Sequence, residues 1–238
     1  MKLDVLAFAA HPDDVEISAG GTIAKMVTAG KKVGIVDFTQ GELGSRGSAE
    51  LRMVESARSS KILGLSVREN LKLADGFFTH TEENLKRIVQ MVRKYQPDVV
   101  LANSITDRHP DHAKGAKLAS EGCFLSGLRK IETELDGAQQ AHWRPRAVYH
   151  YIQDYFIEPD FVVDISDFYE TKLESIKAFS SQFFDPNSSE PSTPISGEDF
   201  FEFIAARAMQ FGRPIGAKYG EGFTSHRYIG VDDLTSLL

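Results

Sequence analysis

The chain has 238 residues, a length that suits a single α/β domain. Its formal net charge of −7 argues against nucleic acid or an anionic membrane surface as a partner, because both would repel it on average. The single cysteine, Cys123, excludes an internal disulfide and a cysteine-rich zinc site. Residues Met1 to Asp4 do not form the apolar run of a signal peptide, and no stretch is long enough for a transmembrane helix, so we expect a cytoplasmic protein.

The first half of the chain alternates between strand-like and helix-like patterns of apolar residues. In chain order we expect strand Leu3–Ala9, helix Val15–Ala29, strand Lys32–Phe38, helix Ala49–Leu63, strand Asn70–Leu73, helix Glu82–Tyr95, strand Asp98–Ala102 and helix Asp111–Leu125. This alternation predicts an α/β fold with a Rossmann-like, mostly parallel sheet, right-handed crossovers and helices on both faces.

The second half has weaker patterns. They predict strands Ala147–Ile152 and Phe161–Ile165, helices Asp167–Phe183 and Phe200–Phe211, an exposed Pro- and Ser-rich loop at Asp185–Gly197, and an irregular tail over Gly212–Gly230. We therefore expect one domain over residues 1–238. Residues 1–126 would form its Rossmann-like core, and residues 127–238 a smaller, irregular part that completes the site.

Two short motifs that share the triplet His-Pro-Asp follow predicted strands. His11-Pro12-Asp13-Asp14 comes after the first strand, and His109-Pro110-Asp111-His112 comes after the strand at Asp98–Ala102. Ligands bind at the carboxyl ends of the strands in an open parallel sheet. We therefore expect the fold to bring both motifs together in one metal site.

The spacing inside each motif supports this interpretation. Residues three apart at the start of a helix lie on the same side, which pairs His11 with Asp14 and His109 with His112. A catalytic zinc takes three protein ligands from nitrogen and oxygen donors and keeps one position open for water. His11, Asp14 and His112 would supply such a set.

The remaining polar side chains of the motifs would lie beside the ion. Asp13 can take a proton from water, His109 can give one to a leaving group, and Asp111 can orient His109. Each motif alone is also a suitable helix cap, because an Asp near a helix N-terminus stabilises the helix without any catalytic role. The presence of two such motifs, both at strand ends, favours the metal site.

Two other kinds of function remain open for this ligand set. Two histidines and one carboxylate also describe the non-haem iron(II) oxygenases. A sugar- or nucleotide-binding module with a structural metal is the other alternative, although a structural zinc site usually has a fourth protein ligand.

At these residues the sequence resembles the PIG-L/LmbE-like family of zinc-dependent N-acetylglucosaminyl deacetylases. The family's first motif stands at Ala10–Asp14 and its second at His109–His112. The loop Thr39–Glu42, followed by Arg52 and Glu55, is also similar to the family. The similarity covers most of the chain and is strongest in the first 125 residues.

The resemblance implies a role for each matching residue. It implies His11, Asp14 and His112 as ligands of Zn²⁺, with Fe²⁺ as the other metal that such sites accept. Asp13 would then be the general base, and His109, supported by Asp111, would be the acid and the oxyanion partner. Some members also carry an aromatic residue from the C-terminal half near the metal, for which Tyr219 and Tyr228 are the candidates here.

A finer resemblance concerns the substrate. The sequence of residues Gly41–Gly47, together with Arg108 directly before the second motif, is similar to the bacillithiol-biosynthesis branch of the family. Members of this branch remove acetate from N-acetylglucosaminyl malate. It implies a small-molecule substrate held by Arg52, Arg108 and Glu42, and a homo-oligomer, since relatives are often hexamers. Glu42 equally suits a role in capping its own loop, and Arg108 equally suits a surface salt bridge.

Overall fold

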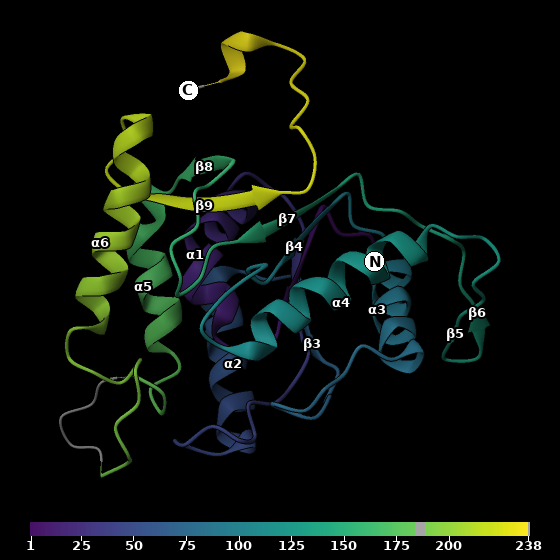
Figure 1. The fold of residues 1–238 in the computed structure, drawn as a ribbon, viewed down its shortest axis with the longest axis horizontal. Helices are drawn as coiled ribbons and strands as arrows, with labels where there is room; N and C mark the ends of the chain where they lie inside the picture. The colour runs from purple at the N-terminus through teal and green to yellow at the C-terminus, as the bar shows by residue number, and fades with distance from the viewer. Residues whose placement is uncertain (184–188, 238) are drawn as a thin grey trace.

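A computed structural model describes residues 1–183 and 189–237, and its centre is a seven-stranded sheet (Figure 1). The strand order is β3-β2-β1-β4-β7-β9-β8, in which β9 is antiparallel to both of its neighbours and every other pair is parallel. The strands are β1 Val5–Ala9, β2 Val33–Asp37, β3 Val67–Asn70, β4 Val99–Ala102, β7 Ala147–Tyr151, β8 Phe161–Asp164 and β9 Gly220–Ser225. A separate hairpin joins β5 Glu134–Leu135 to β6 Ala138–Gln139.

Helices cover both faces of this sheet. They are α1 Asp14–Thr28, α2 Ala49–Leu63, α3 Glu82–Tyr95, α4 Pro110–Ser126, α5 Tyr169–Lys177 and α6 Phe200–Gly212, with short 3₁₀ turns at Ser166–Phe168, Arg213–Ile215 and Leu234–Ser236. One buried cluster joins α3 and α4 to the sheet, and a second joins α1 and α2 to its other face. The predicted α/β class, with a mostly parallel sheet between helices, is confirmed. Among the described helices, none combines the length and the apolar character needed to cross a membrane.

The position of the site follows from the strand order. β1 lies between β2 and β4, so the chain leaves β1 toward one edge of the sheet and later returns on its other side at β4. The crevice beyond the carboxyl ends of two such strands is where open α/β sheets bind ligands. Both His-Pro-Asp motifs begin there, and the side chain of Asn103 ties the two strand ends together by accepting the backbone N–H of Ala10 at 2.9 Å.

Most predicted elements agree with the structure to within a residue or two at each end, and two differ by more. The strand expected at Asn70–Leu73 lies at Val67–Asn70, where Arg68 places a charge inside the strand and pairs with the buried carboxylates of Asp37 and Glu16. The helix expected over Asp167–Phe183 is α5, which ends at Lys177. Beyond it, the backbone N–H and hydroxyl of Ser181 both donate to Glu55 on α2, an interaction that replaces further helical hydrogen bonds.

The expectation of an irregular tail over Gly212–Gly230 is wrong for β9. Gly220 and Gly222 allow close packing there, because a Cβ atom at Gly220 would lie 2.6 Å from Val162 Cγ1, and one at Gly222 would lie 3.0 Å from Phe211 Cζ. Glycine is rare in strands, so the first half of β9 lacks the β-branched and aromatic residues from which a strand is predicted, and only Phe223 and Thr224 supply them. Of the loop expected at Asp185–Gly197, residues 185–188 lie outside the described residues, and 189–197 contain no helix or strand.

The pH dependence of stability tests the buried state of His150 on β7. Burial, with a smaller contribution from the facing ring of His226, lowers the pKa of His150 to about 4, although a hydrogen bond to the carbonyl of Asn103 opposes the shift. Between pH 6.5 and 4, His150 is therefore protonated in the unfolded chain but stays neutral in the folded protein. The free energy of unfolding should fall between pH 6.5 and 4 by a contribution of about 3 kcal/mol from His150, with none above pH 6.5.

Denaturant titrations of the wild type and of His150→Gln across this pH range measure that contribution. The amide of Gln can replace both hydrogen bonds of the ring, to Asn103 and to the Ser120 hydroxyl, without titrating. The variant should lose less stability than the wild type below pH 6.5. Parallel pH profiles for the two proteins would contradict the assignment.

Candidate metal centre

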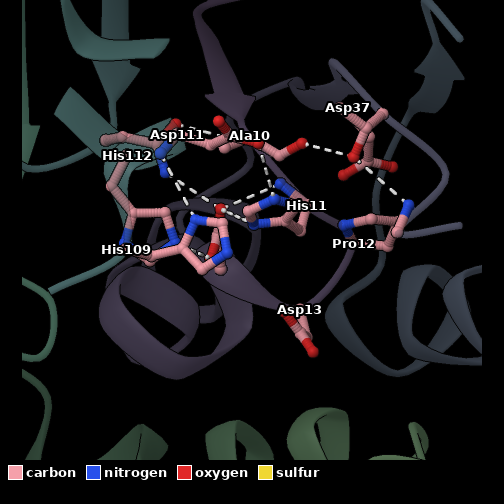
Figure 2. Close-up of polar contacts among 12 residues, drawn as sticks. Ala10, His11, Pro12, Asp13, Asp37, His109, Asp111 and His112 are labelled. Carbon is pink, nitrogen blue, oxygen red and sulfur yellow. Dashed lines mark hydrogen bonds and ion pairs between the residues drawn. The ribbon is translucent and has the colours of Figure 1, made fainter. Parts of the chain in front are cut away.

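Three imidazoles gather beyond the carboxyl ends of β1 and β4, as Figure 2 shows. His11 follows β1, while His109 caps the N-terminus of α4 and His112 lies in its first turn. Pro110 takes the first position of α4, where a missing N–H costs no hydrogen bond. One nitrogen atom from each of the three rings lies within 4.8 Å of the other two.

The carboxylate of Asp14 lies between two of these rings. Its Oδ1 atom is 3.1 Å from His112 Nε2, and its Oδ2 atom is 3.7 Å from His11 Nδ1. Two amides hold it in place: Asn103 Nδ2 donates to Oδ2 at 2.9 Å, and Gln153 Nε2 donates to Oδ1 at 3.1 Å. The structure thus brings together the three residues that the sequence predicts as ligands.

Other carboxylates hold the far nitrogen of both histidines that the sequence predicts as ligands. His112 Nδ1 lies 2.5 Å from Asp107 Oδ2, and His11 Nε2 lies 3.1 Å from Asp75 Oδ1 and 3.4 Å from Asp111 Oδ2. Metal-binding histidines commonly have their second nitrogen bound to a carboxylate, which orients the ring and makes it more basic. The nitrogens left for an ion are therefore His11 Nδ1 and His112 Nε2, and both face Asp14.

The charges of the cluster suit a cation. Burial lowers the pKa of His112, but Asp14 and Asp107 outweigh it and raise the pKa to about 9. Burial also lowers the pKa of His11, and its carboxylate neighbours Asp111, Asp75 and Asp14 raise it to about 10. Two imidazoles and a carboxylate form a donor set that fits zinc and iron(II). The residues present therefore fit a bound divalent metal.

Asp13 differs from its neighbours in backbone conformation and environment. Its φ of 111° lies in a region that non-glycine residues rarely adopt, and such strain is common at functional sites. Its side chain is buried and points away from the imidazoles in Figure 2, with Oδ2 at 3.3 Å from Arg52 Nη1. Burial raises the pKa of Asp13 to about 7, although the charge of Arg52 opposes the rise.

Arg52 is itself held by residues far away in sequence. Its Nη1 atom donates to the Pro12 carbonyl at 2.8 Å as well as to Asp13, and its Nη2 atom donates to Gln182 Oε1. The amide of Gln182 in turn donates to the Arg46 carbonyl at 2.9 Å. The sequence predicts that Arg52 holds substrate, and the structure places it at the cleft wall with its contacts directed to the segment that contains Asp13.

The cluster lies at the floor of a cleft of about 390 Å³. Its wall includes residues from both motifs, together with Ile17, Gly41, Leu43, Gly44, Arg52, Asp75, Gly76, Arg108 and Ile195. Arg108 is partly exposed there, and its Nε atom donates to Asp154 Oδ2 at 2.8 Å.

Several other predicted site residues lie outside this wall. The carboxylate of Glu42 accepts the backbone N–H groups of Gln40 and Asp75, so it caps its own loop and ties it to the loop after β3. Tyr219 stacks on Tyr169 with ring centroids 3.9 Å apart, and Tyr228 is fully exposed. None of these three predicted site residues lines the cleft of the described structure.

Asp111 makes contacts that differ from its predicted role. Its carboxylate lies near His11 and accepts the backbone N–H of Gly76 at 2.8 Å, and Lys114 donates to its other oxygen. It is the backbone N–H of Asp111, not its carboxylate, that donates to His109 Nδ1, at 3.3 Å. The neutral ring of His109 therefore carries its proton on Nε2.

Four residues that hold the site have no role in the sequence interpretation. They are Asp75, Asn103, Asp107 and Gln153. Their common signal is position, since each lies in a segment that follows a parallel strand of the sheet: β3, β4 or β7. The rule that ligands bind at carboxyl strand ends selects these segments. Which polar residue of each segment reaches the three imidazoles and Asp14 depends on the course of its loop.

Comparisons with known proteins agree with this geometry. The sequence profile of the family described as GlcNAc-PI de-N-acetylase (PIG-L) matches residues 6–123, which include both motifs. Over 233 residues the chain is 30% identical to the diacetylchitobiose deacetylase of Thermococcus kodakarensis, covering 92% of this chain and 81% of that protein. It is also 26% identical over 242 residues to the 4-oxalmesaconate hydratase of Pseudomonas putida, covering 94% and 84%.

Solved structures show the same relationship. A conserved protein of Thermus thermophilus superposes with a TM-score of 0.85 at 34% identity, covering 97% of this chain and 98% of that one. The N,N'-diacetylchitobiose deacetylase of Pyrococcus horikoshii superposes with a TM-score of 0.79 at 31% identity, covering 98% and 88%. These similarities extend over nearly the whole chain.

Replacement of Asp107 tests how the outer carboxylates support the metal ligands. In Asp107→Asn the ring of His112 loses a charged partner, so affinity for Zn²⁺ and Fe²⁺ should fall about 10- to 100-fold. Competition with a chromophoric chelator measures this affinity. Asp98→Asn, at the start of β4 in an exposed pair with Lys2, is the matched control and should bind as the wild type does. Equal affinities for the two variants would rule out this role of Asp107.

Proposed function

This chain belongs to the PIG-L family, described as GlcNAc-PI de-N-acetylase, and from that premise we propose that it is a metal-dependent hydrolase that removes the acetyl group from an N-acetylglucosaminyl substrate. The observation that carries the proposal is the convergence of His11, Asp14 and His112 at the cleft, with His109 beside them and Asp13 in the wall of the same cleft. Such a site has ligands for an ion and separate groups for proton transfer.

Asp13 is proposed as the base of the reaction. A bound divalent metal would supply two effects at this site, namely a lower pKa of a coordinated water and polarisation of the amide carbonyl. Asp13 accepts the proton of the attacking water, and a pKa of about 7 suits a base that works near neutral pH. Arg52 keeps this carboxylate in position and compensates part of its buried charge.

His109 is proposed to act on the other side of the reacting amide. Its Nδ1 atom accepts a backbone N–H, so the Nε2–H group is the one free to donate to the oxyanion that forms on the carbonyl oxygen. Burial, together with the neighbouring His11 and His112, lowers the pKa of His109. The ring is therefore neutral near pH 7, and it acts as the acid by taking up the proton that Asp13 removed from the water and passing it to the departing amine. The products are acetate and a free glucosamine conjugate.

We further propose N-acetylglucosaminyl L-malate as the substrate, with Zn²⁺ or Fe²⁺ as the metal. Support comes from Arg108, which lies directly before the second motif and lines the cleft with a partly exposed guanidinium group. Guanidinium groups bind carboxylates in a bidentate geometry, and malate offers carboxylates where diacetylchitobiose offers only a second sugar. Glu42, whose carboxylate is engaged by its own loop, has no direct role in this proposal.

Acetate release from a panel of substrates tests the reaction. The panel contains N-acetylglucosaminyl malate, diacetylchitobiose and N-acetylglucosamine, each with and without a chelator. Asp13→Asn should reduce kcat about 10²- to 10⁴-fold and leave metal affinity unchanged, because the amide cannot accept the proton. Asn is the matched replacement here, since it tolerates the positive φ of this position better than Ala.

Each alternative has its own outcome in this panel. Near-normal turnover in Asp13→Asn would remove Asp13 from the mechanism. Oxygen consumption without acetate release would indicate an iron(II) oxygenase, and tight binding without turnover would indicate a binding module. Hydration of 4-oxalmesaconate without deacetylation would place the chain with its hydratase relative.

A pair of variants at the rim tests the malate proposal. Arg108→Gln should lower kcat/KM for the malate conjugate about 10- to 100-fold, the range expected for a lost charged hydrogen bond, and should leave diacetylchitobiose within about threefold. Asp154→Asn is the matched control, because it removes the partner of Arg108 but keeps the guanidinium group. Equal losses for both substrates in Arg108→Gln would contradict a malate-specific contact.

A further inference from the structure

A small pocket adjoins the candidate cleft on the side of α6. This side pocket lies between α1, α6, β9 and the segment after β7, and its volume is about 70 Å³. It shares Ile17, Arg108 and Ile195 with the wall of the cleft, so the two spaces meet at these residues. In Figure 1, α6 stands at one edge of the molecule beside α5.

The wall of the side pocket is mostly apolar. Its apolar side chains include Ile152, Ile195, Ile204, Ala208, Phe200 and Phe211. Its charged residues are paired with other residues of the same wall: Lys172 pairs with Glu221 at 2.6 Å, Arg108 pairs with Asp154, and Arg207 donates to the carbonyls of residues 153 and 154. The charges in the wall therefore leave an apolar space.

One hydroxyl in this wall has no partner. Ser18 lines the side pocket and is 6% exposed, and its Oγ atom makes no hydrogen bond among the described residues. An apolar occupant leaves this hydroxyl without a partner, and a small bridging water is the group that can complete it.

The side pocket also lies next to the metal ligands. Gln153 is part of its wall, and the amide of the same side chain donates to Asp14 Oδ1 at 3.1 Å. Ser18 stands four residues after Asp14 on α1, which is about one helical turn. The side chain of Gln153 therefore connects the wall of the side pocket to the proposed ligand Asp14.

From this placement we propose that the side pocket receives the acyl chain of the substrate, so that the enzyme also removes N-propionyl and N-butyryl groups. The inference rests on the proposed deacylation at the metal centre. The sugar and malate parts of the substrate are polar and suit the open cleft, whereas the acyl chain is the apolar part. A water-sized group needs at least about 10–15 Å³ of such space, so the side pocket admits a few carbon atoms and excludes a second sugar ring.

The chemistry is the same for each chain length. Water adds to the amide carbonyl, the C–N bond breaks, the acyl group leaves as a carboxylate that carries the oxygen of the water, and the amine nitrogen gains a proton. No oxidant or other co-reactant is needed. The only difference is the apolar surface that the chain buries, and each methylene contributes about fourfold, which corresponds to about 0.8 kcal/mol.

Two variants of α6 change the pocket in opposite directions. Ala208→Leu fills it and should lower kcat/KM for the N-butyryl substrate at least about tenfold relative to the N-acetyl substrate. Ile204→Ala enlarges it and should extend activity to the N-hexanoyl substrate. Ala206→Leu adds the same side chain on the exposed face of α6 and is the matched control, with unchanged chain-length preference. Circular dichroism verifies that each variant is folded, and Ile204→Ala decides the question if Ala208→Leu is not.

Binding of the product carboxylates gives a readout that does not depend on turnover. In calorimetric titrations of the metal-loaded protein, butyrate should bind about tenfold more tightly than acetate, and Ala208→Leu should abolish that difference. The same preference in Ala208→Leu and Ala206→Leu, in binding and in turnover, would overturn the inference while deacetylation stands. A butyrate preference that disappears in Ala208→Leu, without hydrolysis of any amide, would instead sink the proposed function and leave the side pocket assigned.

Discussion

The buried carboxylate of Asp14 is the group on which the arrangement of the site depends. It is 4% exposed, and it accepts hydrogen bonds from the backbone of His11, from Asn103 and from Gln153. These donors come from segments that follow β1, β4 and β7, so one carboxylate joins three strand ends. A buried charge without partners costs several kcal/mol, and the sheet stabilises this one by gathering amides and imidazoles around it.

The second half of the chain contributes to the site through contacts that are distant in sequence. Gln153 reaches Asp14 directly, and Gln182 holds Arg52, which in turn holds Asp13. Glu55 accepts the backbone N–H and hydroxyl of Ser181, which anchors the neighbouring segment to α2. The general base proposed here therefore owes its position to residues well over a hundred positions away, although the motif that contains it is local.

Sequence reasoning predicts those parts of the structure whose cause is local. The amphipathic pattern of Glu82–Tyr95 predicts α3 with the bounds that the structure has, and the two motifs predict which strand ends meet. It fails where long-range contacts decide. β9 begins with two glycines, Gly220 and Gly222, that pack against Val162 and Phe211, and neither neighbour can be inferred from the sequence of the strand itself. The roles of Asp107 and Asp75 could not be predicted for the same reason. Nothing in the sequence around a single loop Asp indicates that its carboxylate will contact a distant or neighbouring histidine of the site.

The strain at Asp13 explains why so many buried contacts surround a short turn. A non-glycine residue in this backbone region costs about 1–3 kcal/mol, and glycine would remove the cost together with the carboxylate. The chain keeps the carboxylate, and ion pairs fix the start of α1. Arg68 joins Glu16 on this helix to Asp37 at the end of β2. Arg52 fixes the turn before α1 by donating hydrogen bonds to the Pro12 carbonyl and the Asp13 carboxylate. Because these contacts belong to the fold and not to the ion, they hold the turn in its strained conformation before any metal binds.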